Sequence, residues 1–152
     1  KAGKRKVAVC GSDYHEDTVF QRLANPTINV LAWSASEQDI LTAVEAGHSY
    51  FTYSPTSLFV DLDVNGETYG SIVPWQAGLE AKLHAVALEP GDQVRLIDQD
   101  KEETLFTSPQ KGDWQITLPV GKPGYIRVEV WRTFFPGLPA LPALVTNPIW
   151  FE

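Results

Sequence analysis

The residues best suited to chemistry lie near the start of the chain, in the segment Gly11-Ser12-Asp13-Tyr14-His15. Asp13 supplies a carboxylate and His15 an imidazole, and this pair of donors suits zinc, manganese or iron. The apolar run over residues 5–10 predicts a short strand covered on both faces. Residues two positions apart at its end can project to the same side, so both donors could reach one metal ion. An N-cap or Asx turn at Asp13 and a surface position for His15 are the alternative interpretation.

A count of donors limits what this segment can do alone. A catalytic zinc site uses about three protein ligands and a water. The other two histidines are His48, near the end of a predicted helix whose dipole favours a cation, and His84, on the polar side of an alternating strand at a sheet edge. Neither lies near the segment in sequence. We therefore expect the chain by itself to bind no metal tightly and to be inactive.

One helix is predicted over residues 37–46. Ser36 precedes it as an N-cap, and Asp39, three residues later, completes an approximate capping box. Gly47 is placed to end the helix in a left-handed turn. An apolar stripe at helical spacing supports the same bounds and consists of Ile40, Leu41, Ala43 and Val44.

From about residue 54 to its end the chain is predicted to be all-β. An alternating run at 58–64 leads into Asn65-Gly66, a strong signal for a short hairpin. Turns rich in Gly, Pro and Asp separate the later segments at the spacing of a sandwich, so we predict an immunoglobulin-like β-sandwich over 54–152. The other predicted strands are 79–88, 93–97, 103–107, 114–118, 125–131 and 144–151, the last interrupted by Pro148 and so placed at an edge or a bulge.

Three motifs, in this order, carry a resemblance to a known family. Gly11–His15 resembles the last metal-ligand motif of PHP-type (polymerase and histidinol phosphatase) metal-dependent hydrolases. Residues 36–55 are similar to the helix and strand that follow that motif in the carbaryl-hydrolase-like CehA/McbA group, which typically end Ala-x-x-x-Gly-Arg-Ser-Phe-x-Thr before a small residue and Pro. Asn147-Pro148-Ile149-Trp150 is similar to the closing Asn-Pro-Ile-aromatic of the same group. The resemblance spans essentially the whole chain.

The resemblance implies a PHP barrel, a distorted (β/α)7 barrel that holds divalent metal ions (Zn, Mn or Fe). Residues 1–53 would be its C-terminal remnant and 54–152 an accessory sandwich. Asp13 and His15 would match the last Asp and His ligands of a site where metal-activated water hydrolyses a phosphoester, an ester or a carbamate of a small-molecule substrate. The implied partner is the N-terminal barrel of the same protein.

The sequence also departs from the family. An early His-x-His and the other ligands are missing from these residues, and His48 stands where the group commonly carries Arg. We therefore expect the C-terminal portion of a longer hydrolase, with the fragment itself not catalytic.

Composition narrows the partners further. A net charge of -7 argues against nucleic acid and against an anionic membrane surface, and no apolar stretch approaches the ~20 residues of a transmembrane helix. The single cysteine, Cys10, is expected to be buried. The alternative function is a non-catalytic module that binds a glycan or a protein through exposed aromatic side chains. The candidates for such a surface are Phe134 and Phe135 in a Pro-rich loop and the tryptophans at 33, 75, 114, 131 and 150.

Overall fold

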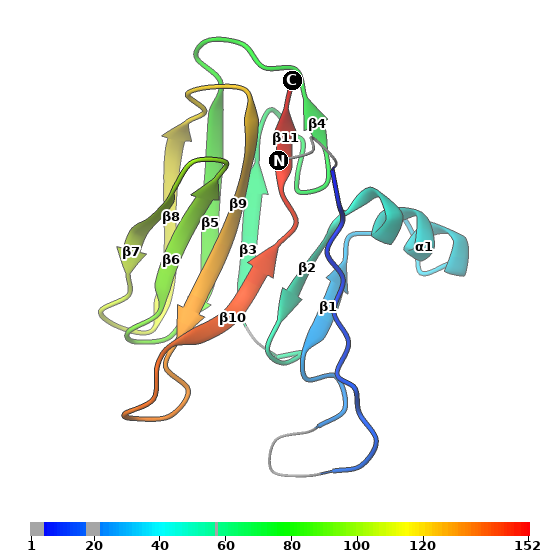
Figure 1. The fold of residues 1–152 in the computed structure, drawn as a ribbon, viewed down its shortest axis with the longest axis vertical. Helices are drawn as coiled ribbons and strands as arrows, with labels where there is room; N and C mark the ends of the chain where they lie inside the picture. The colour runs from blue at the N-terminus through cyan, green and yellow to red at the C-terminus, as the bar shows by residue number, and fades with distance from the viewer. Residues whose placement is uncertain (1–4, 18–21, 57) are drawn as a thin grey trace.

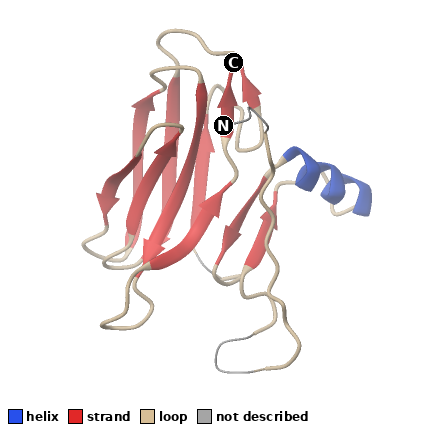
Figure 2. Ribbon diagram, in the orientation of Figure 1, coloured by secondary structure: helices blue, strands red, loops and turns tan. Residues whose placement is uncertain are grey.

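The computed structural model describes residues 5–17, 22–56 and 58–152. The chain is mainly β, with one short helix beside two facing sheets (Figures 1 and 2). Its elements are β1 (Thr27–Val30), α1 (Glu37–Ala46), β2 (Ser49–Thr52), β3 (Phe59–Asp63), β4 (Ile72–Val73), β5 (Glu80–Leu88), β6 (Gln93–Asp98), β7 (Glu102–Thr107), β8 (Gly112–Pro119), β9 (Gly124–Arg132), β10 (Leu141–Thr146) and β11 (Ile149–Phe151).

The larger sheet has β9 at its centre. One edge of β9 pairs with β6, which continues to β7, and the other edge pairs first with β11 and then with β10. From β10 the sheet extends through β2 to β1, while β4 runs parallel to β11. The smaller sheet has the order β3-β5-β8 and lies behind the larger one in Figure 1.

Alternating side chains of both sheets fill the space between them. On β5, Ala81, Leu83 and Ala85 are buried, while the intervening Glu80 and Lys82 are exposed. This period of two is the pattern expected of a strand with one face on the core. The largest fully buried apolar side chains come from both layers and include Leu62, Leu83, Leu88, Leu144 and Ile149.

The helix begins and ends where its capping residues predict. The Ser36 side chain accepts a hydrogen bond from the Asp39 backbone N–H (3.1 Å), and Gly47 adopts the left-handed conformation at φ 80°. The end of α1 contacts the turn before β4 at a second glycine. A Cβ atom at Gly70 would lie 2.5 Å from the carbonyl oxygen of Ala46, so a larger residue there would force the backbone apart.

Several strand predictions need correction. Residues 5–10 form no strand and run as an extended segment, whereas Thr27–Val30, which was not predicted, forms β1. The predicted strand 144–151 is broken at Asn147-Pro148 into β10 and β11, and β10 is an interior strand. His84 also lies on an interior strand, since β5 is the middle of its sheet.

The Asn65-Gly66 turn forms as predicted, with both residues at positive φ and a bridge between Val64 and Glu67. The hairpin ends after that bridge, because the chain then leaves to form β4 beside β11.

The predicted boundary near residue 53 falls between β2 and β3. Strands β1 and β2 precede this boundary, yet β2 pairs with β10 over Leu144↔Thr52 to Thr146↔Tyr50. The two parts therefore share one sheet. The division of the chain into a barrel remnant and a sandwich stays a prediction.

Candidate functional site

The segment that carries Asp13 and His15 is anchored to the sandwich by Asn147. The Ala8 N–H donates to Asn147 Oδ1 (2.9 Å), and Asn147 Nδ2 donates to the Ala8 carbonyl (3.2 Å). The same Nδ2 lies 3.0 Å from Ser49 Oγ and 3.2 Å from the Ser49 carbonyl oxygen. Asn147 and Ser49 are almost fully buried. One amide side chain between β10 and β11 thus holds the segment against β2.

Five residues beyond this anchor, Asp13 and His15 lie next to each other. Asp13 has a left-handed backbone (φ 47°), which Asp adopts more readily than most residues. His15 Nδ1 is 2.8 Å from the Asp13 carbonyl oxygen and 3.8 Å from its Oδ1. Both side chains are exposed, at 75% for His15 and 86% for Asp13, so they are open to a ligand or a further protein surface.

The contact at the Asp13 carbonyl decides which ring nitrogen of His15 is free. A carbonyl oxygen can only accept, so Nδ1 carries the proton and the lone pair of a neutral ring is on Nε2. Metal-binding histidines commonly have this arrangement, with one nitrogen bound to the ion and the other donating to a carbonyl or carboxylate. His15 Nε2 and the Asp13 carboxylate are therefore the two groups of this pair that could bind a divalent metal.

Further ligands do not come from the described residues. Among 5–17, 22–56 and 58–152, no group of three or more His, Cys, Asp or Glu is arranged to hold a metal. His48 Nδ1 donates to the Tyr69 carbonyl (2.9 Å), and His84 lies on the outer face of β5. Cys10 is half-buried rather than buried, and burial raises the pKa of its thiol.

Apolar side chains are exposed over the N-terminal part of the chain. Helix α1 buries Ala43, but its stripe residues Ile40 and Leu41 remain 37% and 50% exposed. Trp33, in the loop before the helix, is 96% exposed. We call these residues the N-terminal apolar surface, which consists of Val7, Val9, Tyr14, Leu23, Leu31, Trp33, Ile40, Leu41 and Tyr53.

The two phenylalanines singled out in the sequence have different environments. Phe134 is partly buried against the core, and its ring lies 4.3 Å from that of Tyr53. Phe135 is 55% exposed at the tip of the loop between β9 and β10, close in sequence to the exposed Leu138 and Leu141. Only Phe135 of the pair is therefore available to a partner.

Four of the five tryptophans already have packing partners. Trp114 stacks on Phe106 at 4.8 Å, and Trp150 lies 5.2 Å from Tyr125. The Arg95 guanidinium covers the Trp131 ring at 4.4 Å. The Trp75 indole N–H donates to the Val120 carbonyl (3.2 Å). Trp33 is the exception, because it is almost fully exposed.

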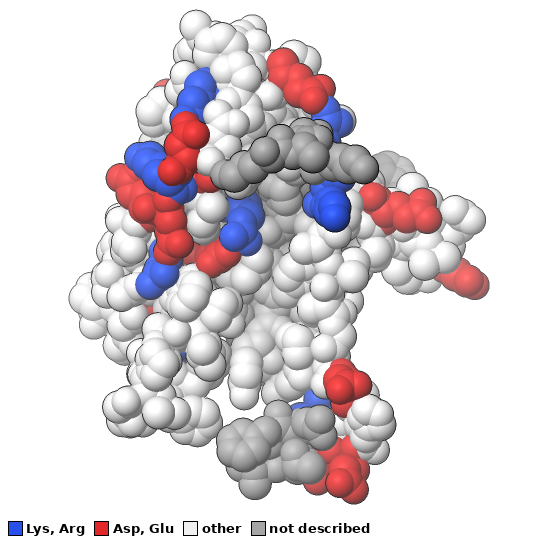
Figure 3. All heavy atoms as spheres, in the orientation of Figure 1, with Lys and Arg blue, Asp and Glu red and all other residues white. Residues whose placement is uncertain are grey.

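Charged side chains are unevenly distributed over the face drawn in Figure 3. They gather over its upper part, while the lower middle is hollowed and nearly uncharged. A shallow hollow of about 300 Å³ is lined by apolar groups of Cys10, Phe51, Tyr53, Pro142 and Val145. Among the described residues, no helix is both long and apolar enough to cross a membrane.

Comparison with known proteins gave no match: no family model, no curated protein and no solved structure is significantly similar to this chain.

Proposed function

We propose that the chain is the C-terminal portion of a PHP-type metal-dependent hydrolase and supplies the last two ligands of its metal site. The observation that carries the proposal is the contact of His15 Nδ1 with the Asp13 carbonyl, which leaves Nε2 and the Asp13 carboxylate as exposed metal donors. Asp13 and His15 would hold one divalent ion (Zn, Mn or Fe). When bound, such an ion supplies an activated water and polarises a phosphoester, ester or carbamate substrate.

In this proposal Asn147 is a positioning residue. The two proposed ligands lie on a solvent-exposed loop. Such a loop needs an anchor that fixes the positions of its side chains if they are to bind a metal. Asn147 supplies this anchor by pairing with both backbone groups of Ala8. It also belongs to the Asn-Pro-Ile-aromatic motif, so one motif of the resemblance would position the other.

We further propose an immunoglobulin-like class for the sandwich. Its strand order supports this, because β3-β5-β8 corresponds to strands A, B and E, and β6-β9-β10 to strands C, F and G of that fold. Strand β7 then extends the second sheet beyond strand C.

The proposed partner is the N-terminal barrel of the same protein. Exposed large apolar side chains, when many occur together, mark sites of interaction in soluble proteins. The N-terminal apolar surface includes both sides of the ligand segment as well as α1. A barrel that completes the metal site would pack against this surface and cover it.

The packing of the tryptophans supports the hydrolase over the alternative of a glycan-binding module. A flat sugar platform needs several aromatic faces open to solvent, whereas Trp75, Trp114, Trp131 and Trp150 are packed against other groups.

Assays on the longer protein, with the barrel preceding this chain, test the proposal. We expect Asp13→Ala and His15→Ala each to lower metal-dependent hydrolysis of chromogenic phosphoester, ester or carbamate substrates at least 100-fold and to reduce the bound metal measured by mass spectrometry. Glu16→Ala and His84→Ala are matched controls on an exposed neighbour and on the outer face of β5, and both should retain activity. Unchanged activity and metal content in both ligand variants would contradict the assignment.

A further inference from the structure

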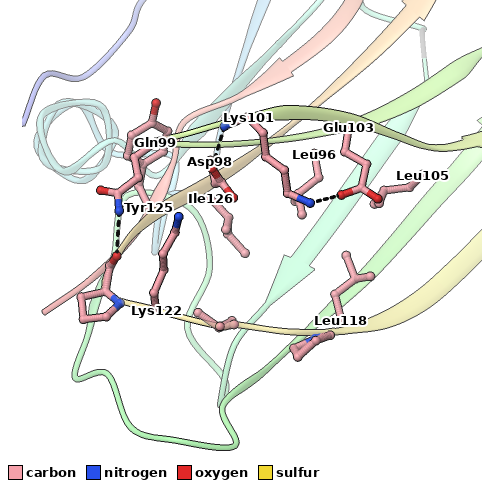
Figure 4. A pocket seen from close by; sticks show the side chains of 14 residues that line it. Leu96, Asp98, Gln99, Lys101, Glu103, Leu105, Leu118, Lys122, Tyr125 and Ile126 are labelled. Carbon is pink, nitrogen blue, oxygen red and sulfur yellow. Dashed lines mark hydrogen bonds and ion pairs between the residues drawn. The ribbon is translucent and has the colours of Figure 1, made fainter.

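A cavity of about 480 Å³ lies in the sandwich, apart from Asp13 and His15 (Figure 4). It opens between the turn that joins β6 to β7 and the turn that joins β8 to β9. Strand β7 pairs with β6 and β8 pairs with β5, so each is at an edge of its own sheet. The space between the sheets is therefore open along these two edges. Further along them, the stacked rings of Phe106 and Trp114 close the gap.

Leucines from three strands form apolar walls of the cavity. Leu96 on β6, Leu105 on β7 and Leu118 on β8 line it and are only half-buried. In contrast, Val94 and Val128 in the adjoining core are fully buried. Figure 4 shows Leu96 and Leu105 on one side of the cavity, next to Lys101 and Glu103, and Leu118 on β8 on the opposite side. The core thus ends in apolar space that its own side chains do not fill.

Contacts between the two turns restrict the mouth. Gln99 Nε2 donates to the Pro123 carbonyl (3.3 Å), and Lys122 forms an ion pair with Asp100. Both contacts join the β6–β7 turn to the β8–β9 turn. Because they are exposed, they contribute little to stability and can open and close readily.

The charges around the mouth already have ion-pair or hydrogen-bond partners. Lys101 forms an ion pair with Glu103, and Asp98 Oδ1 accepts from the backbone N–H groups of Asp100 and Lys101. A charged ligand would have to lose its hydration shell next to charges that already have hydrogen-bond or ion-pair partners, which is unfavourable at an apolar site. An uncharged ligand has no such cost and gains the burial of its apolar surface.

We propose that this cavity binds a small uncharged amphiphile, with an aliphatic or ring body on the leucines and a hydroxyl group at the mouth. Its volume lies within the range of about 300–1,000 Å³ typical of small-molecule pockets. The backbone of the turns supplies the polar edge for the hydroxyl. Neither proposed metal ligand takes part, so the site is independent of the hydrolase assignment.

The test uses the 152-residue chain and three probes of equal chain length: 1-octanol, octanoate and octylammonium. We expect 1-octanol to shift the ¹³C-methyl NMR signals of Leu96, Leu105 and Leu118 saturably and to bind at least tenfold more tightly than either charged probe. The Trp75 indole signal should shift as well, because its N–H bonds to Val120 at the cavity wall, whereas exposed Trp33 should not.

Variants separate the cavity from nonspecific binding. Leu118→Phe and, independently, Leu105→Phe should fill the space and weaken 1-octanol binding at least tenfold while the circular dichroism spectrum is retained. Lys111→Ala removes an exposed ion pair with Glu89, outside the cavity lining, and should leave the affinity unchanged. The proposal is overturned if wild-type methyl signals do not move up to the solubility of 1-octanol, if the three probes bind equally, or if a folded filling variant binds as well as wild type.

Discussion

The sandwich and the N-terminal part of the chain differ in where they place their apolar side chains. Among the described residues before residue 54, two apolar residues, Ala43 and Tyr50, are buried, and nine large ones are exposed. From residue 58 onward the balance reverses, with 20 buried and five exposed. A sheet face can be covered by a second sheet of the same chain, whereas α1 and the segment before β1 have no such layer. The sandwich is therefore stabilised by its own core, and the N-terminal part depends on local anchors.

We expect the largest effect on stability in the sandwich, from a substitution that breaks the ion pair between Asp92 and Arg132. Arg132 donates to both carboxylate oxygens (2.8 and 2.6 Å), and Asp92 is fully buried and also accepts from the Glu89 N–H. Asp92→Ala should lower the free energy of unfolding by about 3–5 kcal/mol, because it leaves Arg132 without its partner. Urea denaturation measures this change. Asp92→Asn keeps the shape but not the charge and should cost less; equal losses would show that the charge alone, and not the packing, accounts for the effect.

The anchor of the N-terminal part is expected to have the next largest effect. Asn147→Ala leaves the backbone groups of Ala8 and the buried Ser49 without their amide partner, at about 1–3 kcal/mol for a buried unsatisfied group. Hydrogen exchange should show loss of protection at Ala8 before the sandwich strands open. Protection at Ala8 equal to wild type would contradict the anchor. Asn29→Ala, which removes a single side-chain contact to Thr52, is the milder control.

Alkaline pH should lower the free energy of unfolding through Tyr69, a buried residue of the sandwich core. Burial, with Tyr50 and Asp61 nearby, raises the pKa of Tyr69 above the ordinary value of 10.0, so the folded state keeps its proton longer than the unfolded state. The stabilisation is fully present below pH 10 and declines as pH rises toward the folded pKa, by up to about 1.4 kcal/mol per pH unit. Tyr69→Phe should decline less between pH 10 and 11 in urea denaturation. An equal decline would locate the sensitivity elsewhere.

The smallest effect is expected on the N-terminal apolar surface. Leu41 is half exposed, so Leu41→Ser should change the unfolding free energy of this chain by no more than about 0.5 kcal/mol. In the longer protein of our proposal, the same substitution should lower the free energy of unfolding several times as much, because the barrel would bury the Leu41 side chain. Thermal denaturation of both forms makes the comparison. A large loss in the short chain would show that α1 is already packed.

Features set by neighbouring residues were predicted well. The helix at 37–46 was predicted because Ser36 and Gly47 mark its ends through local hydrogen bonding and local backbone freedom. The strands from 79 to 131 were predicted because alternation reports directly on which face is buried. Asp13 and His15 lie next to each other because they are two positions apart, and their role as metal ligands stays a prediction.

Pairing across long distances could not be predicted. An apolar run at 5–10 has the same pattern whether or not a strand lies beside it. In the part of the chain that the structure describes, no strand pairs with this run, and its Ala8 backbone instead bonds to the side chain of Asn147, 139 residues away. The short run at β1 became a strand because β2 lies beside it, despite the Asn25-Pro26 break that precedes it. The break in the last predicted strand could be expected from Pro148. The interior position of β10 could not, because it depends on the pairing of β10 with both β2 and β9.

By itself, then, the sequence determined the helix and its caps, the mainly β character and the donors in Gly11–His15. The tertiary structure alone decided that Asn147 holds the segment with Asp13 and His15, that α1 keeps an uncovered apolar face, and that three leucines from three strands surround a cavity. The physical reason is the range of the interactions. Capping and alternation act over a few residues, whereas the anchor, the uncovered face and the cavity exist only once strands distant in sequence have paired.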